Sequence, residues 1–180
     1  MIVTRTVLAE VVVLAPNVIV DHRGWLLEGW SERSLKLAGI DARFVQENRS
    51  HSIRNVLRGL HYQLQPSQGK LVSVLNGEIF DVAVDFRRAS PTFGQSVSGI
   101  LSSTQHQSIW IPPGFAHGFL VLSDTATVLY GLTAYWTPER ERTVAWDDPD
   151  LAIEWPLSNP PILSTKDASG VPFAMAEVYP

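Results

Sequence analysis

The stretch Val56–Gly77 holds the side chains of this chain that are best suited to proton transfer. His61 lies within an apolar and aromatic run that is typical of a β-strand, and histidine is the side chain that most often moves protons near neutral pH. Two cations, Arg58 and Lys70, lie on either side of it in the sequence. A lone histidine in a strand is more often structural, so the rest of the chain must decide between the two interpretations.

The composition is that of an ordinary globular protein. The chain has 180 residues, of which 45% are hydrophobic and 18% charged, and this length suits a single domain over residues 1–180. A formal net charge of −4 gives no reason to expect binding to nucleic acid. There are no cysteines, which excludes disulfides and thiolate metal sites. The apolar run Val7–Ala15 contains Glu10 and is too short to span a bilayer, so we expect no membrane segment and a cytoplasmic protein.

Short strands separated by Gly and Pro turns occupy most of the chain. The expected strands are Val11–Val13, Val18–Val20, Phe44–Asn48, Val56–Gln63, Leu71–Leu75, residues 78–86, Ser96–Leu101, Ser108–Ile111, Gly118–Leu122 and Ala126–Trp136. Asn76-Gly77 predicts a type I′ hairpin, because both central residues of that turn need a positive φ. One helix is expected at Ser31–Leu37, capped by Ser31, and the proline-rich C-terminal tail has room for another short one. This pattern is typical of a closed antiparallel sandwich or barrel with its site inside the mouth.

Two segments resemble the two motifs of the cupin jelly roll. Gly59-Leu60-His61 matches the first motif and Pro112–His117 matches the second. In metal-binding cupins the first motif continues as His-x-His with a later Glu, but Gln63 stands at the second histidine position here and no Glu follows before Gly77. A catalytic metal typically needs three protein ligands. We therefore predict an all-β, cupin-like jelly-roll barrel, with its core at about residues 18–156, that uses no metal or other cofactor and is not an oxygenase.

The chain as a whole resembles the dTDP-4-dehydrorhamnose 3,5-epimerase family from Val18 to Asp167. The segments that carry the resemblance are Asp21–Glu28, Phe44–Ser52, Val56–Gln63, Gln68–Val72, Ile79–Arg87, Ser90–Gly94, Ile109–Leu122, Ala126–Glu141, Asp148–Pro156 and Ser164–Asp167. The resemblance implies proton chemistry next to a ketone. The family inverts C3 and C5 of dTDP-4-keto-6-deoxyglucose through an enolate and forms dTDP-4-keto-L-rhamnose, in the biosynthesis of dTDP-L-rhamnose.

The resemblance also assigns roles to individual residues. It implies that His61 is the base, Asp167 its carboxylate partner, Lys70 the cation near the developing enolate and Tyr130 the acid on the opposite face. The implied substrate-binding residues are Arg23, Glu28, Gln46, Asn48, Arg58, His117 and Lys166. Asp81 also matches a family position, and we expect it to have a supporting role.

Each catalytic candidate has an ordinary structural alternative. Asp167 lies in a polar, proline-bounded tail and by itself is typical of a solvated acid, and Lys70 is typical of an exposed cation at a loop end. Tyr130 shares one face of its expected strand with Val128 and Leu132, and that face could be core or barrel lumen.

Arg58 raises a geometric question, because it lies three residues before His61. In a flat strand the two side chains would point to opposite faces. Gly59 lies between them and could supply a β-bulge that turns one of them toward the other.

Two departures from the family pattern keep other functions open. The family usually has Phe where this chain has Leu26, and Tyr where it has Trp136, and both positions are near the expected substrate. The alternatives are a 3-epimerase that inverts one carbon only and a sugar-binding cupin without enzymatic activity. The β-branched N-terminal runs would leave a sheet edge exposed, and the resemblance implies a homodimer in which this arm pairs with the partner's sheet.

Overall fold

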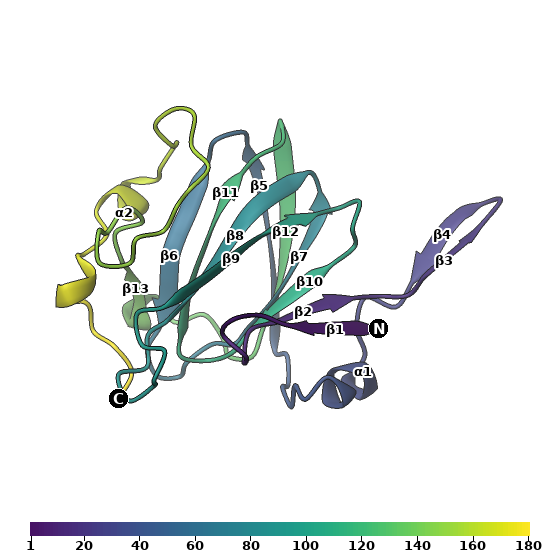
Figure 1. Cartoon of the computed structure of the whole chain (residues 1–180), viewed down its shortest axis with the longest axis horizontal. Coiled ribbons are helices and arrows are strands. Elements are labelled where there is room, and N and C mark those ends of the chain that lie inside the picture. The colour runs from purple at the N-terminus through teal and green to yellow at the C-terminus, as the bar shows by residue number, and fades with distance from the viewer.

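Two antiparallel β-sheets lie face to face and form most of the molecule (Figure 1). The computed structural model describes residues 1–180. The six-stranded sheet has the order β1 (Ile2–Arg5), β2 (Val12–Ala15), β10 (Ser108–Ile111), β7 (Lys70–Asn76), β12 (Thr125–Leu132) and β5 (Gln46–Ile53). The five-stranded sheet has the order β13 (Glu141–Thr143), β6 (Leu57–Gln63), β11 (Phe115–Val121), β8 (Glu78–Asp85) and β9 (Ser96–Ser102). This arrangement confirms the prediction of an all-β, cupin-like protein.

Helices are few and short. The expected N-terminal helix is α1 (Glu32–Leu37), and Ser31 caps it by accepting a hydrogen bond from the Ser34 N–H at 3.2 Å. The Ser34 hydroxyl accepts in turn from the Ser31 N–H at 2.8 Å, so two free N–H groups at the helix start are satisfied. The second helix, α2 (Thr165–Ala168), lies in the C-terminal tail, where a short helix was expected.

The main core fills the space between the two sheets. Val72 and Val128 contribute to it from the six-stranded sheet, and Ile79, Phe115 and Phe119 from the five-stranded sheet. All five side chains are almost completely removed from water. Burial of apolar area on this scale is the main favourable contribution to folding.

The C-terminal tail covers the outer face of the five-stranded sheet. Tyr62 and Phe86 point outward from this sheet, and the rings of Phe173 and Tyr179 in the tail pack against them at centroid distances of 5.2 and 6.0 Å. The Tyr62 hydroxyl also donates to the Glu177 carbonyl at 2.6 Å. Figure 1 shows the tail running past β6 with α2 beside it. The tail therefore holds α2 next to the strand that carries His61.

The predicted hairpin at Asn76-Gly77 is wrong. β7 belongs to the six-stranded sheet and β8 to the five-stranded sheet, so the two strands do not pair. Only Gly77 has a positive φ, at +80°. A Cβ atom there would lie 2.1 Å from the Thr125 carbonyl oxygen. Glycine is therefore needed at this position because the chain crosses from one sheet to the other and passes close to β12 (Thr125–Leu132). The type I′ turn does not form.

Several strand boundaries also differ from the predictions. The strand expected at Phe44–Asn48 is β5, which starts and ends later, and the run expected at Ala126–Trp136 ends at Leu132 in β12. The edge strand β1 was not predicted. It pairs with β2 and has all its residues exposed, so no burial pattern in the sequence marks it.

The strand expected at Val18–Val20 is β3 (Val18–Asp21), which pairs with β4 (Gly24–Leu27) in a hairpin that projects from the barrel (Figure 1). Its apolar side chains Val20 and Leu26 are 74% and 70% exposed. None of the helices has the length and hydrophobicity needed to cross a membrane.

Candidate active site

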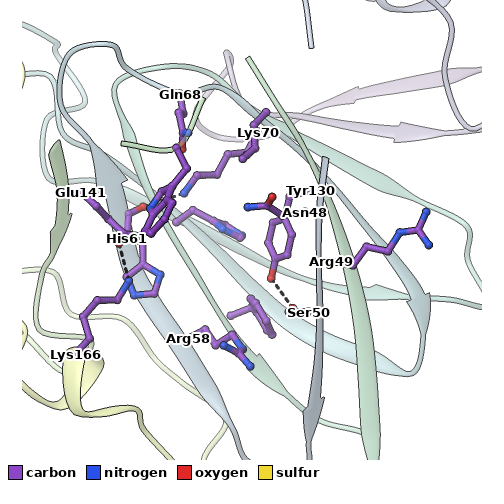
Figure 2. Close-up of a pocket in the computed structure, with 14 residues that line it drawn as sticks. Asn48, Arg49, Ser50, Arg58, His61, Gln68, Lys70, Tyr130, Glu141 and Lys166 are labelled. Carbon is purple, nitrogen blue, oxygen red and sulfur yellow. Dashed lines mark hydrogen bonds and ion pairs between the residues drawn. The ribbon is translucent and has the colours of Figure 1, made fainter. Parts of the chain in front are cut away.

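A cavity of about 410 Å³ opens between the two sheets. Its walls come from β5, β6, β7, β11 and β12, together with the segment after β12 and the start of α2 (Figure 2). The lining residues are Asn48, Arg49, Ser50, Arg58, His61, Gln68, Lys70, His117, Phe119, Tyr130, Leu132, Trp136, Glu141 and Lys166. Only four of them are hydrophobic, so the cavity is suited to a polar, charged ligand.

A bulge in β6 brings Arg58 and His61 into the same cavity. His61 pairs with His117 on β11, whereas Arg58 pairs with Phe119, so β6 holds one residue more than β11 over this interval. Gly59 has φ +125°, and a Cβ atom on it would lie 2.5 Å from the Gly118 Cα. Glycine is required here by both conformation and space. The bulge expected at Gly59 is confirmed.

His61 forms a short hydrogen bond with Asp167. The Nε2 atom lies 2.5 Å from Asp167 Oδ1, and the carboxyl group is almost fully buried. The Ser164 hydroxyl donates to Asp167 Oδ2 at 2.7 Å, and the Gly59 N–H donates to Oδ1 at 3.4 Å. Because Nε2 is engaged with the carboxylate, the neutral ring presents the lone pair of Nδ1 as its free basic site.

The protonation of this pair suits a general base. Burial lowers the pKa of His61, and nearby Lys166 and Lys70 lower it further against the opposing effect of the Asp167 hydrogen bond. Burial alone would raise the pKa of Asp167, but hydrogen bonds from His61 and Ser164 outweigh it and the pKa is lowered. At neutral pH the site therefore holds a neutral imidazole beside a carboxylate.

Lys70 is a buried cation on the cavity floor. Its Nζ donates to the His61 carbonyl at 3.0 Å, which leaves two of its N–H donors unused by that bond. Burial lowers the pKa of Lys70 to about 8, although the charges of Glu141 and Asp81 act to raise it. The ammonium form still predominates at neutral pH. The alternative of an exposed loop-end cation is wrong, because the side chain is directed into the barrel.

Tyr130 faces the cavity from the opposite wall. It lies on β12 in the six-stranded sheet, whereas His61 lies on β6 in the five-stranded sheet (Figure 2). Its hydroxyl lies 3.0 Å from Ser50 Oγ. Burial raises the pKa of Tyr130, so the phenol stays protonated and available as an acid. On the same face, Val128 belongs to the core while Leu132 lines the cavity, so this face of the strand is core at one end and lumen at the other.

A second histidine–carboxylate pair lies beside the first. His117 Nε2 is 2.7 Å from Asp81 Oδ2, and both side chains are buried. The other carboxylate oxygen, Asp81 Oδ1, is buried without a hydrogen-bond partner. Since His117 is the direct cross-strand neighbour of His61, two imidazoles lie side by side on one wall.

A family model described as dTDP-4-dehydrorhamnose 3,5-epimerase matches residues 5–175. The chain belongs to this family. An epimerase of this name from Pseudomonas aeruginosa is 51% identical over 178 residues, which are 98% of each chain. The crystal structure of a dTDP-6-deoxy-D-glucose-3,5-epimerase from Legionella pneumophila in complex with dTDP-4-keto-L-rhamnose is 49% identical, with a TM-score of 0.94 over 97% of this chain and 94% of that one. A 3′-monoepimerase from Streptomyces bikiniensis in complex with dTDP-quinovose is 33% identical, with a TM-score of 0.88 over 94% of this chain and 87% of that one.

The structure brings together most of the residues that resemblance to the epimerase family singled out. Asn48, Arg58, His117 and Lys166 line the cavity with the proton-transfer candidates. Gln46 lies next to it, where its side chain donates to Asn48 Oδ1 at 2.8 Å and accepts from the Trp136 N–H at 3.0 Å.

Arg23 and Glu28 do not reach the cavity of their own chain. Arg23 is at the turn of the projecting β3–β4 hairpin and pairs with Asp21 in solvent. Glu28 follows the hairpin and accepts a hydrogen bond from the Ser31 hydroxyl at 2.8 Å. Both residues therefore lie outside the cavity of their own chain, because the hairpin projects from the barrel (Figure 1), and their role in substrate binding stays a prediction.

Sequence reasoning missed several residues that the epimerase fold places in the cavity. Ser50 is two residues after Asn48 in β5 and so faces the same side, but the predicted strand ended too early to include it. Glu141 pairs with Lys166 at 3.0 Å on the side of the cavity that carries His61 (Figure 2). Its place in a proline-bounded segment resembles that of any solvated acid. No group of three or more His, Asp or Glu side chains has a metal-ligating arrangement.

Proposed function

We propose that the protein inverts C3 and C5 of dTDP-4-keto-6-deoxyglucose to form dTDP-4-keto-L-rhamnose, in the biosynthesis of dTDP-L-rhamnose. The observation that carries this proposal is the placement of a base and an acid on opposite walls of one cavity. Inversion needs this arrangement, because a single group that removes and returns a proton on one face restores the original configuration. His61 on β6 and Tyr130 on β12 meet the requirement.

The reaction begins with proton removal next to the ketone. His61 takes the proton at Nδ1, and the charge that develops on the keto oxygen becomes an enolate. Lys70 supplies a fixed positive charge in a buried site, where such stabilisation is often the largest single catalytic contribution. Asp167 holds the imidazole in its orientation and stabilises the imidazolium. Tyr130 then returns a proton from the other face.

Two cationic side chains on the cavity wall are suited to bind the diphosphate of the nucleotide. Arg58 and Lys166 line the cavity at opposite sides of His61 (Figure 2), and Arg58 is held by a hydrogen bond from its Nε to Ser52 Oγ at 3.0 Å. Guanidinium and ammonium groups both bind phosphate oxygens through charge-assisted hydrogen bonds. Asn48 and Gln46 provide amide groups beside this wall for the rest of the substrate.

Proton NMR of the substrate in D₂O tests the proposal directly. Exchange and inversion at both C3 and C5 are expected with wild-type protein. Exchange at C3 alone would replace the proposal with a 3-epimerase, and exchange at neither carbon would leave a sugar-binding protein. Replacement of Tyr130 by Phe sharpens the test, because the enolate should still form and take up deuterium while net inversion falls much further. Equal loss of exchange and inversion at both carbons would remove Tyr130 from the role of acid.

The metal-free mechanism has its own test. Elemental analysis of the active protein should find no stoichiometric zinc, iron or manganese, and a chelator should leave the rate unchanged. No metal is expected because His61 and His117 are each paired with a carboxylate. Stoichiometric metal together with loss of activity on chelation would contradict the mechanism.

We further propose that two chains form a homodimer and complete each other's binding sites. The exposed edge strand β1 and the apolar hairpin β3–β4 are surfaces that proteins normally cover. Arg23 and Glu28, which lie outside their own cavity, would then reach the cavity of the partner. Light scattering at micromolar concentration should show a dimer, and a monomer would contradict the proposal.

Mixed dimers test whether the binding set is shared between chains. A His61→Asn chain and an Arg23→Ala chain are each expected to be nearly inactive as homodimers. In a heterodimer of the two, one site regains an intact His61 and receives an intact Arg23 from the other chain. Recovery of about half of the wild-type activity per dimer is expected on mixing. Absence of any recovery in confirmed heterodimers would show that Arg23 acts within its own chain.

A further inference from the structure

Inversion by two different groups leaves the protein in a new protonation state. After the first inversion His61 has gained a proton and Tyr130 has lost one. A second inversion on the same sugar requires both groups to return to their starting states. His61 can pass its extra proton from Nδ1 to water in the open cavity, and its pKa is lowered by burial. Tyr130 must regain a proton before it can act as an acid again.

Ser50 is the only protein group that hydrogen-bonds to the Tyr130 hydroxyl. The two oxygens are 3.0 Å apart. Ser50 lies on β5 opposite Val128, which places it on the same face as Tyr130 and diagonal to it. Both residues line the cavity, and Figure 2 shows their hydroxyl groups joined beside the open space. The Ser50 hydroxyl makes no other hydrogen bond with the protein, so it can accept one from water in the cavity.

A tyrosinate at this position is costly and must be reprotonated quickly. Burial raises the pKa of Tyr130, and the hydrogen bond from Ser50 opposes the rise. The charge of Arg58 in the same cavity also acts to lower the pKa, but burial outweighs both effects. A hydroxyl that can donate to the phenolate while it accepts from water meets this need in one step.

We propose that Ser50 is a proton relay that resets Tyr130 between inversions. The Ser50 hydroxyl proton passes to the Tyr130 oxygen, and a water proton passes to Ser50 Oγ in the same movement. The hydroxide left in the cavity is neutralised by the proton that His61 releases. Protons therefore balance over each inversion, and no other reactant is needed. This role rests on the proposed function, in which Tyr130 is the acid.

The test separates the first inversion from the second in Ser50→Ala. A single enzyme-bound substrate should undergo its first inversion within about twofold of the wild-type rate, because Tyr130 starts protonated. The second inversion and the steady-state rate should fall by ~10²-fold, the lower end of what a positioned proton donor contributes. Proton NMR after rapid quenching should then show the singly inverted sugar accumulating. Ser50→Thr keeps the hydroxyl in a strand that favours β-branched residues, and should restore the second step.

Two outcomes would overturn the proposal. Equal slowing of both inversions would mean that Ser50 only orients Tyr130, and an unchanged rate for both would mean that it has no part in the reaction. Thr127→Val is the matched control, because it removes a 2.9 Å hydrogen bond between His51 and the Thr127 hydroxyl on the same two strands outside the cavity. It should change neither rate. Failure of the proposed function is distinct from these outcomes, because the wild-type protein would then show exchange at C3 alone or at neither carbon.

Discussion

The histidines of the two histidine–carboxylate pairs are neighbours in one sheet, but their carboxylates differ in the hydrogen bonds that they accept. Asp167 comes from α2 in the tail and receives hydrogen bonds from His61, Ser164 and the Gly59 backbone. Asp81 comes from β8, is almost fully buried, and has one oxygen without any partner. The His61 side chain is 22% exposed and that of His117 only 4%.

This difference shows how one pair of residue types takes two roles. A carboxylate with all its hydrogen bonds in place can hold an imidazole whose other nitrogen faces substrate, and this is the arrangement at His61. A buried oxygen without a partner normally costs free energy. The negative charge of Asp81 acts on Lys70, whose pKa it raises against the larger effect of burial. The His61–Asp167 pair is therefore suited to move protons, and the carboxylate of the His117–Asp81 pair helps to keep Lys70 charged.

The largest effect is expected when each of the two histidines is replaced separately by asparagine. His61→Asn should lower deuterium exchange at both carbons by ~10²–10⁴-fold, the usual contribution of a general base, with nucleotide affinity nearly unchanged. His117→Asn should lower exchange by ~10-fold or less and act mainly on substrate affinity, because its Nε2 is buried against Asp81. The measurement is the exchange rate by proton NMR in D₂O. Comparable loss in both variants would erase the distinction between the pairs.

The two carboxylates should also respond differently to an amide. In Asp167→Asn the Ser164 hydroxyl can still donate to the amide oxygen, so the NH₂ group faces His61 Nε2 and forces the proton to Nδ1. The base then loses its free lone pair, and kcat should fall by ~10²-fold or more.

In Asp81→Asn no donor lies near the free oxygen, so the amide oxygen can stay on the His117 N–H and kcat should fall by ~10-fold or less. Imidazole ¹⁵N chemical shifts report the tautomers. A change at His117 with none at His61 would contradict this account.

The pH profile of kcat/KM should have an acid limb that is set by His61 and an alkaline limb that is set by Lys70. His61 must be neutral, so activity is lost as the pH falls through its lowered pKa, and the acid limb should lie below the ordinary value of 6.5. Lys70 must be charged, so activity is lost as the pH rises through about 8. Asp81→Asn should move only the alkaline limb to lower pH, because it removes a charge that favours the ammonium. Movement of the acid limb would link Asp81 to His61 instead.

The smallest effect concerns stability. The pKa of Asp167 is lowered in the folded protein, so its ionised form stabilises the fold above the unfolded pKa, and this stabilisation is lost as the pH falls through the lower folded value. Asp167→Asn should lower the free energy of unfolding by about 1–3 kcal/mol at pH 7. The difference from wild type should shrink below about pH 4. Urea unfolding at several pH values measures this difference in the free energy of unfolding. A difference that is independent of pH would show that the charge of Asp167 does not stabilise the fold.

Patterns within one strand were enough to predict much of the barrel. Runs of β-branched and apolar residues between Gly/Pro turns marked most of the central strands, because both signals depend on residues that are close in the sequence. The bulge at Gly59 was also predictable once the family resemblance assigned Arg58 and His61 to one site, because the two side chains need one extra residue between them to share a face. The roles of His61, Lys70, Tyr130 and Asp167 came from family resemblance, as no local pattern distinguished them from structural residues.

Only the tertiary structure decided which distant side chains meet. Asp167 reaches His61 across 106 residues because the tail packs its aromatic rings on the outer face of the sheet. Ser50 meets Tyr130 through the pairing of β5 with β12. The turn signal at Asn76-Gly77 failed for the same reason, because the crowded approach to β12 and the crossing between sheets outweighed the local preference. Local preferences are worth about 1 kcal/mol or less per residue, and the burial that a sheet gains by its long-range pairing is several times larger.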